Sequence, residues 1–169
     1  YDPVCDSLVF VEQFRTGALA AQRDGQFDPD FSPWLVEICA GIIEPGESAE
    51  EVARREITEE TGCEVLDIFP VMKYLASPGC LSETQQLFCA RVIAPPDGGI
   101  HGLEHEDEDI RVKVASVDEA LSWMDSPNGQ NVMTLVALQW FKLHRDEMYA
   151  RWGARHTPEP QPRALITCG

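Results

Sequence analysis

The stretch from Gly41 to Cys63 constrains the fold of this chain more than any other part of the sequence. Ser48 is followed three residues later by Glu51, which is the spacing of a capping box at the start of a helix. Gly62 readily adopts the left-handed conformation with which many helices end. The stretch therefore predicts one short helix over residues 48–61, entered through a glycine-bearing loop over residues 41–47.

Three glutamates are expected on one face of that helix. Glu56 and Glu60 are four residues apart and Glu59 is three residues from Glu56, so their carboxylates are neighbours. Like charges at this spacing repel, and acids near a helix C-terminus oppose the macrodipole by about 0.3–1 kcal/mol each. Mg²⁺ would compensate this repulsion, because it prefers a few carboxylates together with water and substrate phosphate as ligands. A solvated acidic surface is the alternative, and the three glutamates alone do not exclude it.

The helix belongs to a longer pattern of fixed positions. These positions are Gly41, Glu47, Arg55, Glu56, Ile57, Glu59, Glu60 and Gly62, closed by an apolar position. The pattern resembles the Nudix box, and chance would produce it on the order of once in 10⁸ start sites or more rarely. Cys63 closes it where the family usually has an aliphatic residue, and cysteine packs as a small hydrophobe. The resemblance implies an α/β fold, the Nudix α/β/α sandwich, with a mixed sheet between helices.

The charge of the chain restricts its partners. The 169 residues include 29 acidic and 13 basic side chains, for a formal net charge of −16. Such a surface repels nucleic-acid backbones and anionic membranes, so we expect neither as a partner. The length predicts one domain with a sizeable core, which we place at residues 1–152. Residues 153–169 contain Pro158, Pro160 and Pro162, and we expect a disordered tail there.

Cysteine usage and hydropathy bear on the compartment. The six cysteines form no Cys-x-x-Cys pair, so neither a zinc site nor a disulfide framework is expected. Reduced thiols are typical of a cytoplasmic protein. The sequence shows neither an apolar run of membrane-spanning length nor a signal peptide. We therefore expect a cytoplasmic location.

The remaining sequence predicts strands around the central helix. Apolar and alternating runs predict strands at residues 7–14, 34–40, 64–76 (broken around Pro70), 84–93 and 110–115. Ser116 and Glu119 predict the cap of a short helix that runs to Trp123, and a long helix with an apolar face is expected over residues 130–150. Residues 15–33 are expected to form a polar loop. Strands on both sides of the central helix fit an α/β sandwich.

The chain opens on a turn. Asp2-Pro3 and Cys5-Asp6 predict a hairpin turn directly before the strand at residues 7–14. Such a turn implies a partner strand further upstream, so we expect the given sequence to lack N-terminal strands of its domain. A sheet edge left open in this way would favour aggregation.

Beyond the box, the chain is similar to bacterial ADP-ribose pyrophosphatases over residues 1–152. Pro78 stands fifteen residues after Cys63, where that subfamily characteristically has a proline. Further shared stretches are Glu12–Arg15, Pro33–Glu37, Leu75–Gly79, Gly99–Leu103, Glu106–Val112 and Ala137–Trp140. The resemblance implies hydrolysis of ADP-ribose to AMP and ribose 5-phosphate, with Mg²⁺ as cofactor and a homodimer as the full-length form.

The resemblance also implies roles for single residues. The ligands of two or three Mg²⁺ ions, for which Mn²⁺ can substitute, would be the carbonyl of Ala40 with Glu56, Glu60 and Glu108. The catalytic residues would be Glu106, as general base on water, and Glu59 in support. ADP-ribose would contact Arg15, Glu37, Ile42, Ser77 and Glu83. Structural positions would be Gly41, Gly62, Pro78 and Arg55, the last of which orients the glutamates through ion pairs.

The chemistry of a pyrophosphate agrees with such a set. Its negative charge repels hydroxide, so hydrolysis needs cations on the phosphate oxygens and a carboxylate that accepts a proton from water. Without the box nearby, Glu106 would be an ordinary solvated member of the acidic run at residues 104–109.

Two other functions remain open. The substrate could be another nucleoside diphosphate sugar, because the subfamily takes its adenine contacts largely from the N-terminal segment that we expect to be missing. The chain could also be a catalytically silent Nudix domain that senses a nucleotide for a regulator. The intact glutamates and the lack of a basic helix-turn-helix argue against the regulator.

Overall fold

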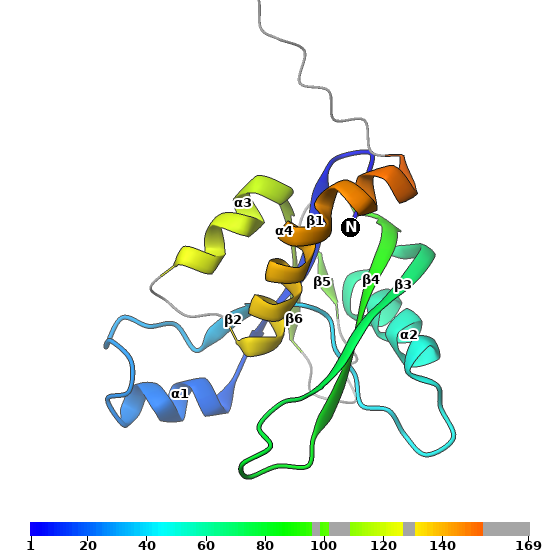
Figure 1. Ribbon diagram of the computed structural model, residues 1–169. Coiled ribbons are helices and arrows are strands. Elements are labelled where there is room, and N and C mark those ends of the chain that lie inside the picture. Colours follow the sequence, from blue (N-terminus) through cyan, green and yellow to red (C-terminus); the bar gives the residue numbers. More distant parts are fainter. Residues whose placement is uncertain (96–98, 102–108, 127–130, 154–169) are drawn as a thin grey trace, which may run out of the picture.

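The computed structural model describes residues 1–95, 99–101, 109–126 and 131–153, whose strands form two sheets (Figure 1). The larger sheet has the order β2–β1–β6–β5, with strands β1 (Ser7–Phe14), β2 (Trp34–Glu37), β5 (Ile100–His101) and β6 (Ile110–Ser116). The smaller sheet pairs β3 (Glu64–Leu75) with β4 (Thr84–Ile93). The helices are α1 (Thr16–Arg23), α2 (Ala49–Thr61), α3 (Val117–Ser122) and α4 (Val132–Trp152), with a 3₁₀ turn η2 (Trp123–Asp125) after α3.

Helices cover both faces of the larger sheet. Leu8 and Phe10 of β1 belong to a core cluster with Leu138 of α4. Val9, between them, packs against a second cluster together with Ile57 of α2. Because neighbouring residues of a strand point to opposite faces, α4 and α2 lie on opposite sides of β1. The expected α/β sandwich is confirmed.

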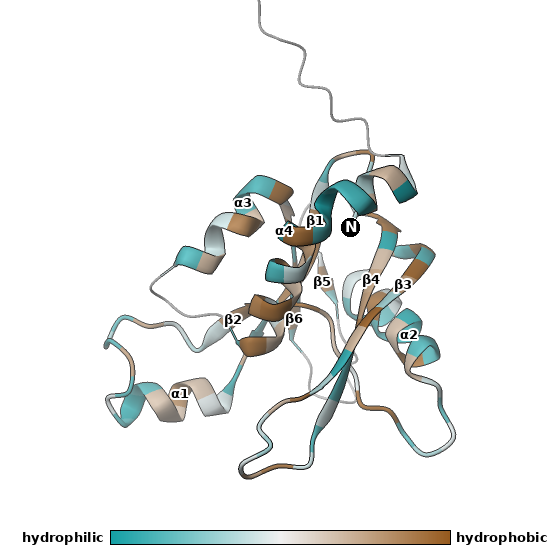
Figure 2. Cartoon of the chain, in the orientation of Figure 1, coloured by the Kyte–Doolittle hydropathy of each residue, from teal (hydrophilic) through white to brown (hydrophobic). Residues whose placement is uncertain are grey.

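α4 supplies a large part of the core. Its buried residues are Thr134, Leu138, Trp140, Phe141, Met148 and Trp152. Figure 2 shows the helix as a mixture of brown and teal residues, as expected of a helix with one face in the core. Burial of each large apolar side chain contributes about 1.5–3 kcal/mol to the free energy of unfolding, so the packing of α4 against β1 stabilises the fold substantially.

The hairpin turn predicted at the start of the chain is confirmed. Asp2 and Ser7 exchange both backbone hydrogen bonds, at 2.9 and 3.1 Å. The Asp2 carboxylate accepts from the backbone N–H of Val4 at 2.8 Å, and Asp6 turns the chain with a φ of 47°. The turn sets the register with which β1 enters the sheet.

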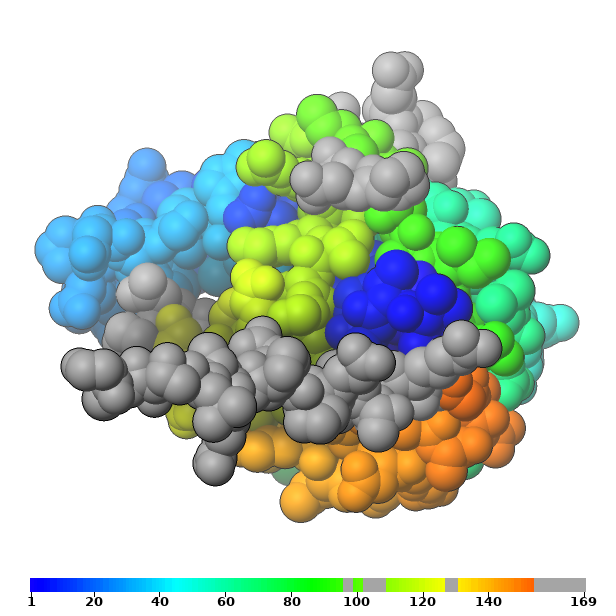
Figure 3. Space-filling model, turned by 90° about the horizontal axis from the view of Figure 1, so that it is seen from above, coloured from blue at the N-terminus to red at the C-terminus, as the bar shows by residue number. Residues whose placement is uncertain are grey.

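Tyr1 connects this turn to the second sheet. Its nitrogen donates to the carbonyl of Ala90 at 2.7 Å, and its carbonyl accepts from the N–H of Val92 at 2.9 Å. This is the hydrogen-bond pattern of a parallel pair with Arg91. Every strand pair among the described residues is antiparallel, so the mixed sheet that the resemblance implies is not found there beyond this contact of Tyr1. In Figure 3 the N-terminal residues, in blue, lie beside the yellow-green residues of β6 and α3.

Several predicted boundaries agree with the structure to within one or two residues, and the end of β2 differs most. Strands β1 and β4 have the predicted ends, and β3 shifts its register between Pro70 and Met72, which is the predicted interruption. β2 ends at Glu37 and not at Ala40. The reason is that the backbone N–H of Ile38 bonds to Thr134 of α4, at 3.3 Å, where a longer strand would bond to its neighbour.

The polar loop expected over residues 15–33 is wrong in its first half, where α1 lies. None of its residues is fully buried, and its half-buried face, Ala18, Leu19, Ala21 and Gln22, is too short to give a clear apolar period in the sequence. Its alanines, Ala18, Ala20 and Ala21, have high intrinsic helix propensity, and the side chain of Gln22 holds the following loop against the helix by donating to the carbonyls of Pro29 and Phe31.

α4 ends at Trp152 with Gly153 as a left-handed cap, which coincides with the end of the predicted domain. Residues 154–169, the rest of the predicted tail, lie outside the described residues. Within the described ranges, no helix is both long and apolar enough to cross a membrane.

Candidate active site

The predicted capping box fixes the start of α2. The Ser48 hydroxyl accepts from the N–H of Glu51 at 3.2 Å, and the Glu51 carboxylate accepts from the N–H of Ser48 at 3.1 Å. The Ser48 hydroxyl also donates to the Glu51 carboxylate at 2.6 Å, and this bond lowers the pKa of Glu51 because it stabilises the ionised form. Gly62 ends the helix with a φ of 66°. Both ends of the helix are thus set locally, and the glutamates between them have defined directions.

Glu60 is a buried carboxylate that ties α2 to two strands. Its side chain is 4 % exposed. One oxygen accepts from the backbone N–H of Ala40 and the other from the amide of Gln13, both at 3.3 Å. Burial raises the pKa of the adjacent Cys39 thiol, and the negative charge of Glu60 raises it further, so this thiol stays protonated. Glu60 therefore lies where β1, α2 and the end of β2 meet.

Gly41 leaves open the space beside it that Glu56 occupies. A Cβ atom built on Gly41 would be 2.0 Å from Oε1 of Glu56 and 2.2 Å from its carboxyl carbon. A side chain at position 41 would therefore displace the carboxylate of Glu56 from this place. Glu56 and Glu60 therefore both reach the segment Ala40–Gly41, which brings three of the residues assigned to metal binding together.

Arg55 forms ion pairs with three glutamates of the box. Its guanidinium is 2.9 Å from Glu56, 3.1 Å from Glu59 and 3.7 Å from Glu47. The charge of Glu56, followed by the hydrogen bond to Glu59, raises the pKa of Arg55. These are the ion pairs that the resemblance implies. The ion pairs with Arg55 direct the carboxylates of Glu56 and Glu59. The catalytic role of Glu59 stays a prediction.

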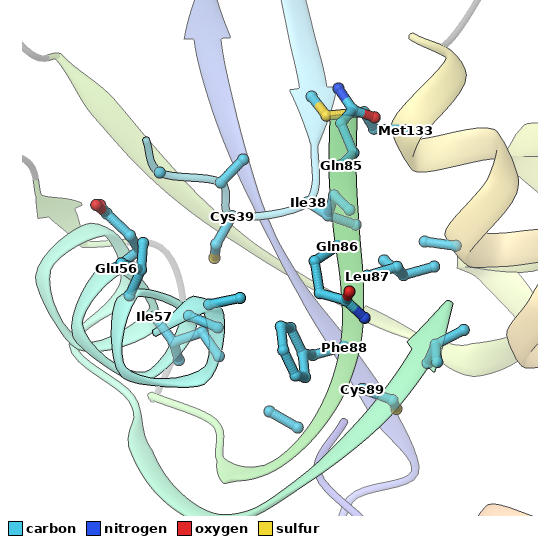
Figure 4. A pocket seen from close by; sticks show the side chains of 18 of the residues that line it. Ile38, Cys39, Glu56, Ile57, Gln85, Gln86, Leu87, Phe88, Cys89 and Met133 are labelled. Atoms are coloured by element: carbon cyan, nitrogen blue, oxygen red, sulfur yellow. The ribbon is translucent and has the colours of Figure 1, made fainter. Parts of the chain in front are cut away.

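A pocket of about 830 Å³ opens beside this cluster (Figure 4). Its walls come from α2, from the segment after β2, from β4 and from the first half of α4. Of the predicted site residues, it is lined by Ala40, Gly41, Ile42, Glu56 and Glu83. Figure 4 shows Glu56 and Cys39 on one side and Gln85 with Met133 at another end. Carboxylates at the wall of a pocket of this size suit a nucleotide-sized ligand whose phosphates are met by cations.

Arg15 and Glu37, both assigned to the substrate, contact each other. Oε2 of Glu37 is 2.8 Å from Nε and 2.6 Å from Nη2 of Arg15. The Glu37 side chain is 3 % exposed and the Arg15 side chain 44 % exposed. Neither residue is among those that line the pocket, whereas Ile38, directly after Glu37, is.

The tip of the β3–β4 hairpin holds the other predicted contacts. The carbonyl of Ser77 accepts from the N–H groups of Cys80 and Leu81, at 3.1 and 2.9 Å, which closes a turn around Pro78. Glu83 accepts from the side chain of Gln85 at 2.9 Å. Glu83 reaches the pocket, whereas Ser77 and Pro78 are not among its lining residues.

Glu106 and Glu108 lie outside the described residues, so their roles stay predictions. In the described ranges, no group of three or more His, Cys, Asp or Glu side chains is arranged to hold a metal ion. Of the predicted ligands, the carboxylates of Glu56 and Glu60 and the carbonyl of Ala40 belong to these ranges, and their role as ligands stays a prediction. Such a set of hard oxygen donors fits Mg²⁺, which keeps water and phosphate as further ligands.

Sequence reasoning missed three residues at this site. Gln13 holds Glu60, and alternation along β1 could have placed it on the side of Arg15. Asn131 donates to Glu37 through a short contact that no spacing rule reveals. The ring of His101 would be 2.8 Å from a Cβ on Gly62, so β5 packs closely against the end of α2.

Comparisons with known proteins agree with this geometry. The NUDIX domain profile matches residues 5–136. The chain is 43 % identical to an ADP-ribose pyrophosphatase of Escherichia coli (strain K12) over 152 residues, which cover 90 % of this chain and 69 % of that protein. An ADP-ribose pyrophosphatase of Haemophilus influenzae is 38 % identical over 152 residues, 90 % of this chain and 68 % of that protein.

A solved structure has the same fold. A crystal structure of an ADP compounds hydrolase superposes with a TM-score of 0.66 at 20 % sequence identity and covers 86 % of this chain and 69 % of its own. The box helix, the carboxylates at Ala40–Gly41 and the profile match lead to one conclusion: the chain belongs to the NUDIX family.

Proposed function

We propose that this chain is a pyrophosphohydrolase that cleaves ADP-ribose to AMP and ribose 5-phosphate with Mg²⁺ as cofactor. The observation that carries the proposal is the approach of Glu56 and Glu60 to Ala40–Gly41 at the wall of the pocket. The 43 % identity to a protein named ADP-ribose pyrophosphatase supports the choice of substrate.

The residues that would hold the metal fit its chemistry. Glu56, Glu60 and the carbonyl of Ala40 offer oxygen ligands, and Glu108 adds one from outside the described residues. Bound ions, two or three Mg²⁺ with Mn²⁺ as a substitute, supply positive charge to the pyrophosphate oxygens. Arg55 keeps the carboxylates apart and directed while no ion is bound, because it balances Glu56 and Glu59.

Other residues of the chain bind substrate and move the proton. Glu106 takes a proton from the attacking water, and Glu59 is the second candidate for this step. Arg15, Ile42 and Glu83 contact the two halves of ADP-ribose around the pocket, with Ser77 at the hairpin tip. The five cysteines of the described residues are free thiols, which fits our proposal of a cytoplasmic enzyme. We also propose a homodimer for the full-length protein.

A substrate panel tests the proposal. Purified protein is assayed with ADP-ribose, GDP-mannose and UDP-glucose under the same Mg²⁺ concentration. We expect the highest kcat/KM for ADP-ribose, because kcat/KM measures discrimination between substrates. Preference for either of the other two sugars would move the assignment to another nucleoside diphosphate sugar. Binding of nucleotides without any turnover would favour the silent sensor.

A further inference from the structure

Glu37 is a buried carboxylate whose two oxygens are both engaged by other side chains. It is 2 % exposed and lies at the end of β2. One oxygen takes the ion pair with Arg15, the residue between β1 and α1, and the other accepts from the side-chain amide of Asn131, the N-cap residue of α4. A buried charge costs free energy unless it is paired and hydrogen-bonded, and these two partners meet that need.

Asn131 performs two tasks with one side chain. Its oxygen accepts from the N–H of Thr134 at 2.8 Å, which caps α4, while its nitrogen donates to Glu37. Asp and Ser cap helices about as well as Asn, but an aspartate would place a second negative charge against Glu37. The need for a donor on the same side chain therefore explains asparagine at this cap.

The cluster is fixed to the pocket by the backbone. Thr134 is fully buried, and its hydroxyl accepts from the N–H of Ile38 at 3.3 Å. Ile38 and Met133, the neighbours of Glu37 and Thr134, both line the pocket, Ile38 near the middle of the view in Figure 4 and Met133 beside Gln85. The bond between Thr134 and Ile38 therefore connects the Asn131 cap to two residues of the pocket wall.

Arg15 is the exposed member of the cluster. Glu37 holds its Nε and Nη2 atoms, and within the described residues no polar contact engages Nη1. A guanidinium held along one edge is pre-organised to present its other edge to a phosphate oxygen.

We infer that Glu37 and Asn131 are positioning residues, which fix the guanidinium of Arg15 for the diphosphate of the substrate. This role rests on the proposed function and deepens it. Glu37 then acts through Arg15 and not by direct contact with ADP-ribose, as its burial and its two engaged oxygens indicate. Asn131 extends the substrate site to the start of α4.

Asn131→Ser tests this inference. Serine keeps the helix cap but is too short to reach Glu37 as the amide does. We expect the Kd of ADP-ribose, measured by calorimetry in EDTA, and the KM in Mg²⁺ to rise about tenfold, with kcat changed less than about twofold. Asn131→Asp also keeps the cap and repels Glu37, so its loss of affinity should be at least as large. Ser116→Ala is the matched control, because Ser116 caps α3 away from the pocket; its Kd should equal that of the wild type.

A double-mutant cycle separates positioning from a general structural effect. In an Arg15→Ala background, Asn131→Ser should cause no further loss of affinity, because the residue through which it acts is gone. Equal Kd values for wild type and Asn131→Ser, or losses that add in the double mutant, would overturn the inference while leaving the proposed function intact. A wild-type chain that neither binds nor hydrolyses ADP-ribose would overturn the proposed function, and the inference with it.

Discussion

Replacement of Gly41 by alanine separates the stability of the fold from the function of the glutamate cluster. The new methyl group would be 2.0–2.3 Å from three atoms of Glu56, far inside van der Waals contact. The end of a glutamate side chain can rotate away, so the backbone need not move. We therefore expect Glu56 to leave its place beside Ala40–Gly41 while the fold persists.

The magnitudes follow from what Glu56 loses. A displaced rotamer costs about 0.5–1.5 kcal/mol, and loss of its partly exposed ion pair with Arg55 adds about 0.2–1 kcal/mol. For a domain of this size, a total of about 1–2 kcal/mol corresponds to a fall in Tm of roughly 2–8 °C. Disturbed ligand geometry should weaken Mg²⁺ binding about 10- to 100-fold and lower activity accordingly.

The assay is thermal unfolding combined with a Mg²⁺ titration of activity. Gly17→Ala is the matched control, because Gly17 lies in exposed α1 with open space around it, and this variant should keep full activity. In a Glu56→Ala background, Gly41→Ala should cost no further stability, since the clash is absent. Full activity of Gly41→Ala, or equal destabilisation in both backgrounds, would refute the packing argument.

Three further outcomes are expected. Glu106→Gln should lower kcat by about 10²–10⁴ with little change in KM, whereas Glu104→Gln should be neutral in the same kinetic assay; near-normal kcat for Glu106→Gln would transfer the role of base to Glu59. Mg²⁺ should raise the Tm of the wild type and raise that of Glu60→Gln less, in melting curves with Mg²⁺ and with chelator; identical curves would contradict a metal site at Glu60. Burial, followed by the hydrogen bond to Asp6, raises the pKa of Tyr149 to about 12. The protonated hydroxyl of Tyr149 therefore stabilises the folded state fully below about pH 10, and this stabilisation is lost as the pH rises toward 12. Tyr149→Phe should remove the fall in Tm that this titration causes at alkaline pH, and an unchanged dependence of Tm on pH would contradict the assignment.

The local signals of the sequence predicted the central helix and most strands. Ser48, Glu51 and Gly62 fix the ends of α2 through contacts within a few residues, so spacing alone finds them. The same holds for the turn between Asp2 and Ser7. The short helix α1 was missed because eight residues show too little of an apolar period, and its contacts with the loop that follows cannot be read from spacing.

The partners of the buried carboxylates could not be predicted in this way. Glu37 meets Asn131 across 94 positions of the chain, and Glu60 meets Gln13 across 47. Such pairs depend on how β1, β2 and α4 pack, which a single sequence does not encode locally. The resemblance assigned Glu37 to the substrate, whereas the contacts across the fold favour support of Arg15.

Direct detection of products tests the central claim most closely. Purified protein is incubated with ADP-ribose, and the reaction is followed by phosphorus NMR with Mg²⁺ and with EDTA, for the wild type and for Glu60→Gln. The account predicts AMP and ribose 5-phosphate in equal amounts from the wild type with Mg²⁺, essentially none with EDTA, and a much slower reaction of Glu60→Gln. Intact ADP-ribose after incubation of the wild type with Mg²⁺, or hydrolysis at the same rate in EDTA, would contradict it.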